Sequence, residues 1–413
     1  MENFKPIFRF AVMSDIHYQN EHTIQRDYFE KGVKDAYAYG KNHLLYQQLD
    51  ALFIVGDFTN SGSEREFEAF KTSMDKVLQP ETELTISIAG HEFQHEGEPA
   101  TIERLSRFFG MEPDVHKKLG DFHFISISTT YGDEFNDEKR QFAYDALFKA
   151  AKENPKKPIF FFQHPHLRGT VYGSLGWGKP GLERVLMNFP QIIDFSGHSH
   201  APNNHPRNIH QRHFTSVGIG NMFYFDMDEF DKVYGEVPPS QQPTPDRPHD
   251  AAQFLIVEVD AGGAVLIKPY DIISSSFFHS GWHIPAPWNP QTFTYTDARY
   301  LNAAKPYFKP DAEVVIDELT ADKIAFTFDQ AVIDEYQVDA YDITIKRVSD
   351  DVIVRKISIW SEYYFMDMSE RLSQVIDKLD SHTAYELSIK AHGFFRTTST
   401  DGLILPFTTP EAT

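Results

Sequence analysis

Short apolar runs alternate with helix-like segments along the first half of the chain. Each run has the length and composition of a buried strand, and the runs lie at residues 7–13, 51–55, 84–89, 122–128, 158–163 and 191–196. Capping signals or an apolar face predict helices between these runs, at residues 63–77, 101–109, 137–152 and 180–187. Alternation of this kind predicts a layered α/β domain.

Beyond about residue 212 the pattern predicts strands alone, at residues 213–217, 254–259 and 264–270. Gly262-Gly263 between the last two is a hairpin-turn signal. Residues 235–250 hold five prolines, which exclude a helix or a central strand. We interpret this proline-rich segment as a surface loop, with a flap beside a binding site as the alternative.

The last quarter of the chain alternates apolar and polar residues with a period of two. The clearest runs begin at Ile324, Tyr341 and Tyr385, and about seven such strands at short spacing are typical of a β-sandwich. The run that ends at Ala391 resembles a fibronectin type III domain, and Tyr385 stands where that family carries its corner tyrosine. We therefore expect a small all-β sandwich of the immunoglobulin or fibronectin type.

The segment between the two patterned regions is rich in proline and aromatic residues. A flexible linker would not be so aromatic, so we expect a strap packed on the first domain. The predicted organisation is an α/β domain over residues 1–280, a connecting strap over 281–309 and a β-sandwich over 310–413.

The charge balance narrows the range of partners. The chain carries 39 basic and 60 acidic residues, a formal net charge of −21, without a basic stripe. Repulsion of this sign disfavours nucleic acid, whereas a small anionic substrate stays compatible because a bound metal reverses the local sign. No apolar run is long enough to span a bilayer, so we expect no membrane partner.

The sequence holds no cysteine. This excludes disulfides and thiolate metal sites and fits a reducing compartment, so we expect a cytoplasmic location. Domains of the predicted sandwich type often mediate protein contacts. A protein partner for this domain, and with it an exported or cell-surface location, therefore stays open.

A compact polar group follows each of five predicted strands. The groups are Asp15-Ile16-His17, Gly56-Asp57, Gly90-His91-Glu92, His164-Pro165-His166 and Gly197-His198-Ser199-His200. Binding sites of α/β sheets form at the carboxyl ends of strands, and residues two apart on an extended backbone point the same way. These side chains therefore share one edge. Carboxylates with imidazoles suit Mn, Fe or Zn, and a carboxylate shared by two metals suits displacement at phosphorus.

Five motifs come in the order found in the calcineurin-like metallophosphoesterases: Asp15-x-His17, Gly56-Asp57-x-x-Asn60, Gly90-His91-Glu92, His164 and Gly197-His198-x-His200. The resemblance implies a four-layer α/β/β/α sandwich with a dinuclear metal centre. It further implies that Asp57 bridges two metals, the first held also by Asp15, His17 and His200, and the second by His164 and His198. His91 would act beside the leaving oxygen, with Asn60 orienting it.

The resemblance implies a metal-dependent phosphoesterase with two divalent ions (Mn, Fe or Zn). Such an enzyme would hydrolyse a small phosphodiester or phosphomonoester by attack of a metal-bound hydroxide. The alternative is a degenerate scaffold that holds one metal and acts as a binding module. Purple acid phosphatases carry tyrosine where Asn60 stands and lack His17, so we expect no tyrosinate–iron colour.

One departure from the family pattern concerns the third motif. The family has Gly-Asn-His-Asp/Glu there, and the Asn carbonyl binds the second metal, whereas this chain has Ala89-Gly90-His91-Glu92. The second site is therefore one ligand short and is expected to bind its metal more weakly. A water, Gln94 or His95 is a candidate substitute.

We do not assign the other polar and aromatic residues near the motifs to the metal centre. We expect His166 to contact substrate or a carbonyl, Glu92 to serve as a structural acceptor, and residues 203–205 to form a solvated loop. Tyr172 and Trp177 lie in a glycine-rich loop that would either stack on a nucleobase or another planar leaving group or form exposed aromatic packing.

Overall fold

The computed structural model describes residues 4–227 and 252–412. Its contacts divide the chain into two compact units, and the boundary falls between Thr296 and Asp297. The proline-rich segment 235–250 lies outside the described residues. Among the described residues, no helix combines the length and apolar character needed to cross a bilayer.

The first unit contains two sheets. One has the order β12-β11-β10-β1-β2-β3, with β13 also paired to β11. Its strands are β1 (Pro6–Met13), β2 (Ala51–Val55), β3 (Glu83–Ser87), β10 (Gln253–Asp260), β11 (Val265–Asp271), β12 (Ser276–Phe277) and β13 (Trp282–Ile284). The strands β1, β2 and β3 run parallel, and β10 is antiparallel to β1.

The second sheet has the order β4-β5-β6-β7-β9-β8. Its strands are β4 (Asp114–Leu119), β5 (Phe122–Ile127), β6 (Ile159–Phe162), β7 (Ile192–Ser196), β8 (Ile209–Gln211) and β9 (Thr215–Gly218). The neighbours β5, β6, β7 and β9 are parallel. Parallel strands end at a common edge, so the segments that follow them in each sheet come together.

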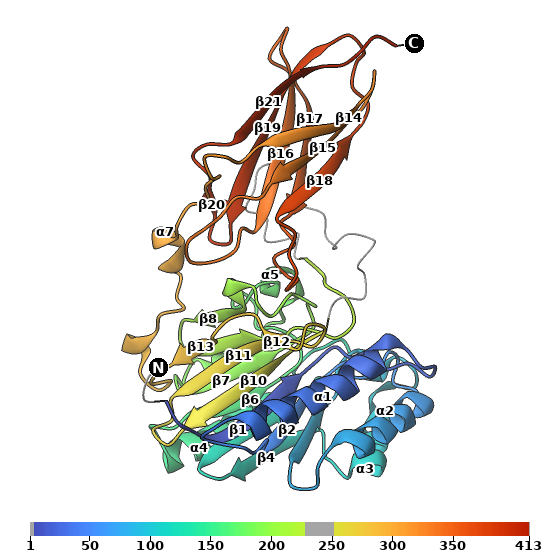
Figure 1. Ribbon diagram of the computed structural model, residues 1–413. Coiled ribbons are helices and arrows are strands. Elements are labelled where there is room, and N and C mark those ends of the chain that lie inside the picture. The colour runs from blue at the N-terminus through green and yellow to red at the C-terminus, as the bar shows by residue number, and fades with distance from the viewer. Residues whose placement is uncertain (1–3, 228–251, 413) are drawn as a thin grey trace. The chain divides into compact units, whose positions relative to one another are not determined.

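Helices cover the outer faces of the two sheets (Figure 1), and three apolar cores lie between the layers. These helices are α1 (Ile24–Asn42), α2 (Glu64–Val77), α3 (Gly97–Phe109), α4 (Asp137–Glu153) and α6 (Glu183–Leu186). The single turn α5 (Ser174–Trp177) lies instead at the strand ends, where Trp177 packs on His198. Phe10 and Phe53 of the first sheet meet Phe160 and Phe162 of the second in the central core. The predicted α/β/β/α sandwich is confirmed.

Local signals fix several helix ends. The predicted capping box of Ser63 and Glu66 is present at the start of α2, and Gly110 ends α3 with a left-handed φ of 65°. The pattern does not predict α1, because its buried face includes Gln25, Gly32 and Gly40 and so carries a weak apolar signal.

The second unit is a β-sandwich that buries Phe326, Tyr341 and Leu387. Its sheets are β14 (Val314–Leu319), β15 (Ile324–Asp329) and β18 (Arg371–Ile376) on one side, and β16 (Ala340–Arg347), β17 (Ile353–Trp360), β19 (Ala384–Gly393), β20 (Thr397–Thr398) and β21 (Leu403–Thr408) on the other. The short helix α7 (Arg299–Asn302) precedes them. The backbone N–H of Asp380 donates to the hydroxyl of Tyr385 (2.9 Å), which is the contact expected of a corner tyrosine.

The first unit extends past residue 280, where the sequence places its end. The strand β13 pairs with β11, and Gln211 donates to the carbonyl of Tyr295 (2.9 Å). These pairings join segments far apart in the sequence, so local composition does not reveal them.

Asp194 is a buried carboxyl in the middle of β7. Its Oδ1 accepts from the amide of Gln163 (3.3 Å), and within the described residues its Oδ2 has no hydrogen-bond partner. Burial raises the pKa of Asp194 to about 8, against the weaker opposing effect of Gln163. The folded protein therefore holds a proton that the unfolded chain releases near the ordinary value of 3.8.

We expect Asp194→Asn to gain stability relative to the wild type as pH rises from 3.8 to about 8. The bound proton stabilises the fold fully below the unfolded pKa, and this contribution is lost as pH rises through the folded pKa, by up to about 1.4 kcal/mol per pH unit. Asparagine needs no proton. Urea unfolding of both proteins across this range measures the difference, and parallel pH profiles would contradict the assignment.

Candidate metal centre

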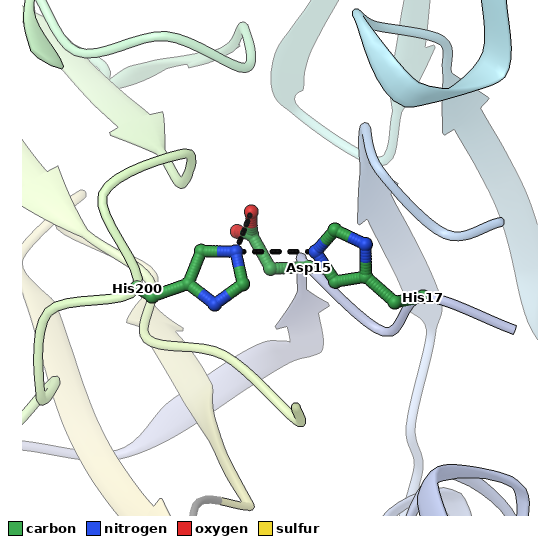
Figure 2. A group of neighbouring side chains, drawn as sticks. All are labelled: Asp15, His17 and His200. Atoms are coloured by element: carbon green, nitrogen blue, oxygen red, sulfur yellow. Dashed lines mark hydrogen bonds and ion pairs between the residues drawn. The ribbon is translucent and has the colours of Figure 1, made fainter. Parts of the chain in front are cut away.

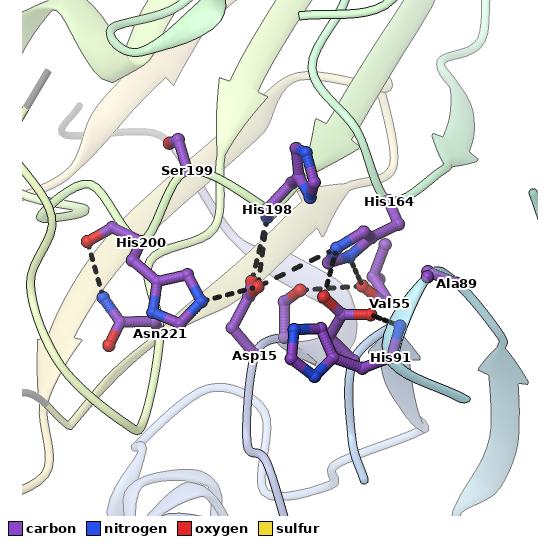
Figure 3. A network of polar contacts seen from close by, with 12 residues as sticks. Asp15, Val55, Ala89, His91, His164, His198, Ser199, His200 and Asn221 are labelled. Atoms are coloured by element: carbon purple, nitrogen blue, oxygen red, sulfur yellow. Dashed lines mark hydrogen bonds and ion pairs between the residues drawn. The ribbon is translucent and has the colours of Figure 1, made fainter. Parts of the chain in front are cut away.

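The polar groups predicted from the sequence lie together at the carboxyl edge of the two sheets. Asp15 and His17 follow β1, Asp57 follows β2, and His91 opens the 3₁₀ turn after β3. From the second sheet, His164 follows β6, and His198 and His200 follow β7. Figure 3 shows Asp15, His91, His164 and His200 converging from both sheets.

Asp15, His17 and His200 form a first group whose ligand atoms all lie within 4.8 Å of one another. The Nε2 atoms of His17 and His200 are 3.1 Å apart, and Nε2 of His200 lies 3.3 Å from Oδ1 of Asp15 (Figure 2). A carboxylate oxygen and two imidazole nitrogens thus point at one spot.

Asp57, His164 and His198 form a second group of the same kind. Nε2 of His164 lies 3.0 Å from Oδ2 of Asp57. Asp57 also belongs to a third group, with His17 and His91. Its carboxylate therefore stands between the first and second groups.

Five of these residues hold a left-handed backbone. Their φ values are 54° for Asp15, 53° for His17, 49° for Asp57, 74° for His198 and 53° for His200. This region is unfavourable for residues other than glycine, and such strain gathers at functional sites. The strained residues are therefore concentrated at the strand ends that carry the site.

Gly56 allows a close approach between the two sheets at the site. Its φ is 73°, and a Cβ atom there would lie 2.6 Å from the ring of His164. A side chain at position 56 would therefore displace His164 from Asp57.

Backbone carbonyls fix which imidazole nitrogen faces the centre. Nδ1 of His164 donates to the carbonyl of Val55 (2.9 Å), and Nδ1 of His200 donates to that of Tyr224 (3.1 Å). The proton on Nδ1 leaves a lone pair on Nε2, which is the tautomer of a metal-ligating histidine with a carbonyl behind it. Nε2 of His164 is buried and faces the carboxylate of Asp57. These residues fit a divalent metal ion.

Electrostatics favour positive charge between the groups. Burial by itself would raise the carboxyl pKa values, but His164 outweighs it together with neighbouring imidazoles and holds the pKa of both Asp15 and Asp57 well below the usual range. Burial lowers the pKa of His17 to about 3 and of His198 to about 4. Burial also opposes a charge on His164, yet Asp57 and Asp15 raise its pKa well above normal. Two buried anionic carboxylates therefore favour positive charge at this spot, either on His164 or on a bound cation.

Residues 8–202 match the family model of the calcineurin-like phosphoesterases. This part of the chain belongs to that family. No curated protein matches the sequence. The recognition made on the five motifs is therefore confirmed for the phosphoesterase domain.

Solved structures of both kinds of domain are similar to this chain. The purple acid phosphatase PPD1 of yellow lupin (Lupinus luteus) shares 13% identity, covering 68% of this chain and 54% of its own, with a TM-score of 0.47. PhoD shares 12% identity, covering 64% of this chain and 65% of its own, with a TM-score of 0.41. The fn3 domain of the human collagen alpha-1(XX) chain has 12% identity over 27% of this chain and 91% of its own, with a TM-score of 0.20. The chain thus spans about half the length of the lupin enzyme.

His91 lies at the rim of the first group of the phosphoesterase domain, with its ring 4.4 Å from that of His17. Its backbone N–H donates to Oδ1 of Asp57 (3.0 Å), and its Nδ1 donates to the backbone carbonyl of Asn60 (2.7 Å). The contact from residue 60 is thus made by the main chain and not by the amide side chain.

Glu92 holds the loops beneath the site. Its carboxylate accepts from the backbone N–H groups of Asp57 (3.0 Å), Thr59 (2.8 Å) and Ala89 (3.0 Å). Burial, reinforced by the charge of Asp57, raises the pKa of Glu92 to about 8. The structure agrees with the structural role expected for this residue.

His166 does not make the contact predicted for it. Its two ring nitrogens bond the hydroxyls of Ser196 (2.8 Å) and Ser199 (2.7 Å), and the side chain is buried. It therefore braces the segment that carries His198 and His200. The two serines are distant in sequence, so the spacing of His166 from His164 gives no hint of them.

The loop after His200 is buried, so the prediction of a solvated loop is wrong. Asn203, Asn204 and His205 are buried, and the ring of His205 stacks on Tyr172 (4.0 Å). Tyr172 is buried too, which removes it from the residues that could stack on a ligand. The other residue of that pair, Trp177, is 38% exposed and packs edge-on against His198 (5.6 Å).

Three residues of the site have no signal in the motifs. The Asn221 side chain donates to the carbonyl of His200 (2.8 Å), and Phe223 packs on His17 (5.0 Å). Tyr224 packs on His200 (4.3 Å). They follow β9, whose place beside β7 depends on the sheet order.

Proposed function

We propose that this protein is a metal-dependent phosphoesterase that hydrolyses small phosphomonoesters or phosphodiesters at a dinuclear centre. The observation that carries the proposal is the place of Asp57, which belongs to the second group and also forms a group with His17 and His91, so that it stands next to the first group. A carboxylate shared by two metal ions is the framework of two-metal hydrolysis at phosphorus. Membership of residues 8–202 in the phosphoesterase family supports it.

Asp15, His17 and His200 would hold the first ion, His164 and His198 the second, and Asp57 both. Ions held there would polarise the phosphate oxygens and lower the pKa of an attacking water. The carbonyls of Val55 and Tyr224 keep the imidazoles in the ligating tautomer. Nδ1 of His91 is bound to the carbonyl of Asn60, so Nε2 is the nitrogen that would face the leaving oxygen. His91 would give a proton there from its imidazolium form and would keep the proton on Nδ1.

The surroundings favour a small substrate with an apolar part. Trp177, Phe223 and Tyr224 place aromatic rings against the imidazoles of both groups. The net charge of −21 disfavours nucleic acid as a substrate. Among phosphate esters, the rings favour those whose leaving group is planar or apolar.

A second candidate is a binding module with a single metal. The observation that favours it is Gly90, which offers no side chain to the second group. The two functions differ in turnover, because a module that holds one ion would bind phosphate esters without hydrolysing them.

The test is hydrolysis of p-nitrophenyl phosphate and bis(p-nitrophenyl) phosphate by metal-free protein with added Mn²⁺. We expect turnover that requires the metal, that a chelator removes and that fresh Mn²⁺ restores. A folded, metal-loaded protein that hydrolyses neither ester would favour the binding module instead.

A further inference from the structure

Asp133 lies beside Gly90, the position at which the family pattern has an asparagine ligand. The backbone N–H of Gly90 donates to Oδ1 of Asp133 (2.8 Å). A Cβ atom built on Gly90 would lie only 2.6 Å from Oδ2 of Asp133. The carboxylate therefore occupies the space into which a side chain at position 90 would extend.

A tight turn after β5 aims this carboxylate. The backbone N–H of Thr130 donates to the carbonyl of Glu134 (2.9 Å), and the turn between them has left-handed φ values at Gly132 (81°) and Asp133 (56°). β5 is parallel to β6, so the turn lies at the same sheet edge as His164. Asp133 thus approaches the second group from an element that none of the five motifs includes.

The two oxygens of Asp133 have different environments. Oδ1 accepts from Gly90 and from the hydroxyl of Thr129 (3.3 Å). No residue in the described part of the chain donates a hydrogen bond to Oδ2. The Asp133 side chain is partly buried. Hydrogen bonds hold its Oδ1, so its Oδ2 is the oxygen that can bind a metal ion.

We propose that Oδ2 of Asp133 is the oxygen ligand of the second metal ion and replaces the side chain that Gly90 does not provide. This inference rests on the proposed function. A carboxylate brings a full negative charge where the family pattern has a neutral amide, which suits a hard divalent cation. It removes the reason to expect a weak second site. Gln94 and His95, the substitutes considered from the sequence, are exposed.

The experiment is calorimetric titration of metal-free protein with Mn²⁺, with metal content measured after dialysis. We expect wild type to bind two ions, and Asp133→Ala to lose about 10- to 100-fold or more in affinity at one site while the other is unchanged. Glu134→Ala, which removes a neighbouring exposed carboxylate, is the matched control and should bind like wild type.

A rescue variant separates ligation from a loss of loop structure. Gly90 has φ −52° and ψ −44°, a conformation open to any residue, and Asp133→Ala vacates the space beside it. The double variant Gly90→Asn/Asp133→Ala should therefore regain the second ion. Two sites of wild-type affinity in Asp133→Ala, or equal weakening of both sites without rescue, would overturn the inference. Wild-type protein that binds no metal at all would overturn the proposed function as well.

Discussion

Asp57→Asn lowers kcat/KM for an aryl phosphate ester by at least about 10³-fold, roughly 4 kcal/mol of transition-state stabilisation. The substitution keeps the shape of the side chain and an acceptor for the N–H of His91. It removes the negative charge that faces His164 and that lies between the first and second groups. Initial rates at saturating Mn²⁺ give the comparison.

The matched control is Asp137→Asn, which makes the same change on the surface of α4. The Asp137 side chain is 99% exposed, and among residues 4–227 and 252–412 it pairs only with Arg140. This variant should keep wild-type rates. Turnover of Asp57→Asn within about tenfold of wild type, or 1.4 kcal/mol, would exclude Asp57 as the shared ligand.

Glu258→Ala destabilises the first unit by about 3–5 kcal/mol, the cost of leaving a buried charge without its partner. Glu258 and Arg9 face each other across β1 and β10, and both side chains are at most 2% exposed. Nε and Nη2 of Arg9 donate to Oε1 of Glu258 (2.8 and 2.6 Å), and Nη1 donates to the carbonyls of Tyr46 and Gln48. Urea unfolding followed by circular dichroism measures the loss.

Two controls bracket this prediction. Glu258→Gln keeps an acceptor for Arg9 and should cost less than Glu258→Ala. Asp75→Ala breaks an ion pair with Lys71 on the surface of α2, where Asp75 is 62% exposed, and such pairs contribute about 0–1 kcal/mol. Equal decreases in the free energy of unfolding for Asp75→Ala and Glu258→Ala would show that the buried ion pair stabilises the fold no more than the surface pair does.

The sequence predicts those parts of the site that depend on one strand and the residues just after it. Asp15 and His17 illustrate this, because a buried strand and a spacing of two residues place both side chains at one point. The same reasoning applies to His198 and His200 after β7. Each such motif is local, and the parallel order of the strands brings the motifs together.

The remaining features depend on contacts between distant segments. Asp133 meets Gly90 across 43 positions, and His166 meets serines 30 and 33 positions away. The strand β13 joins the first unit through its pairing with β11. Neither periodicity nor spacing carries such information. The sequence therefore shows that position 90 has no side chain, and only the fold shows that Asp133 lies beside it.

The central claim is that the two groups on either side of Asp57 hold metal ions. Anomalous scattering from crystals grown with Mn²⁺ tests it most directly. We predict two peaks, one beside the facing nitrogens of His17 and His200 and one beside Nε2 of His164, both in contact with Asp57. A map with no peak at these nitrogens would contradict the account.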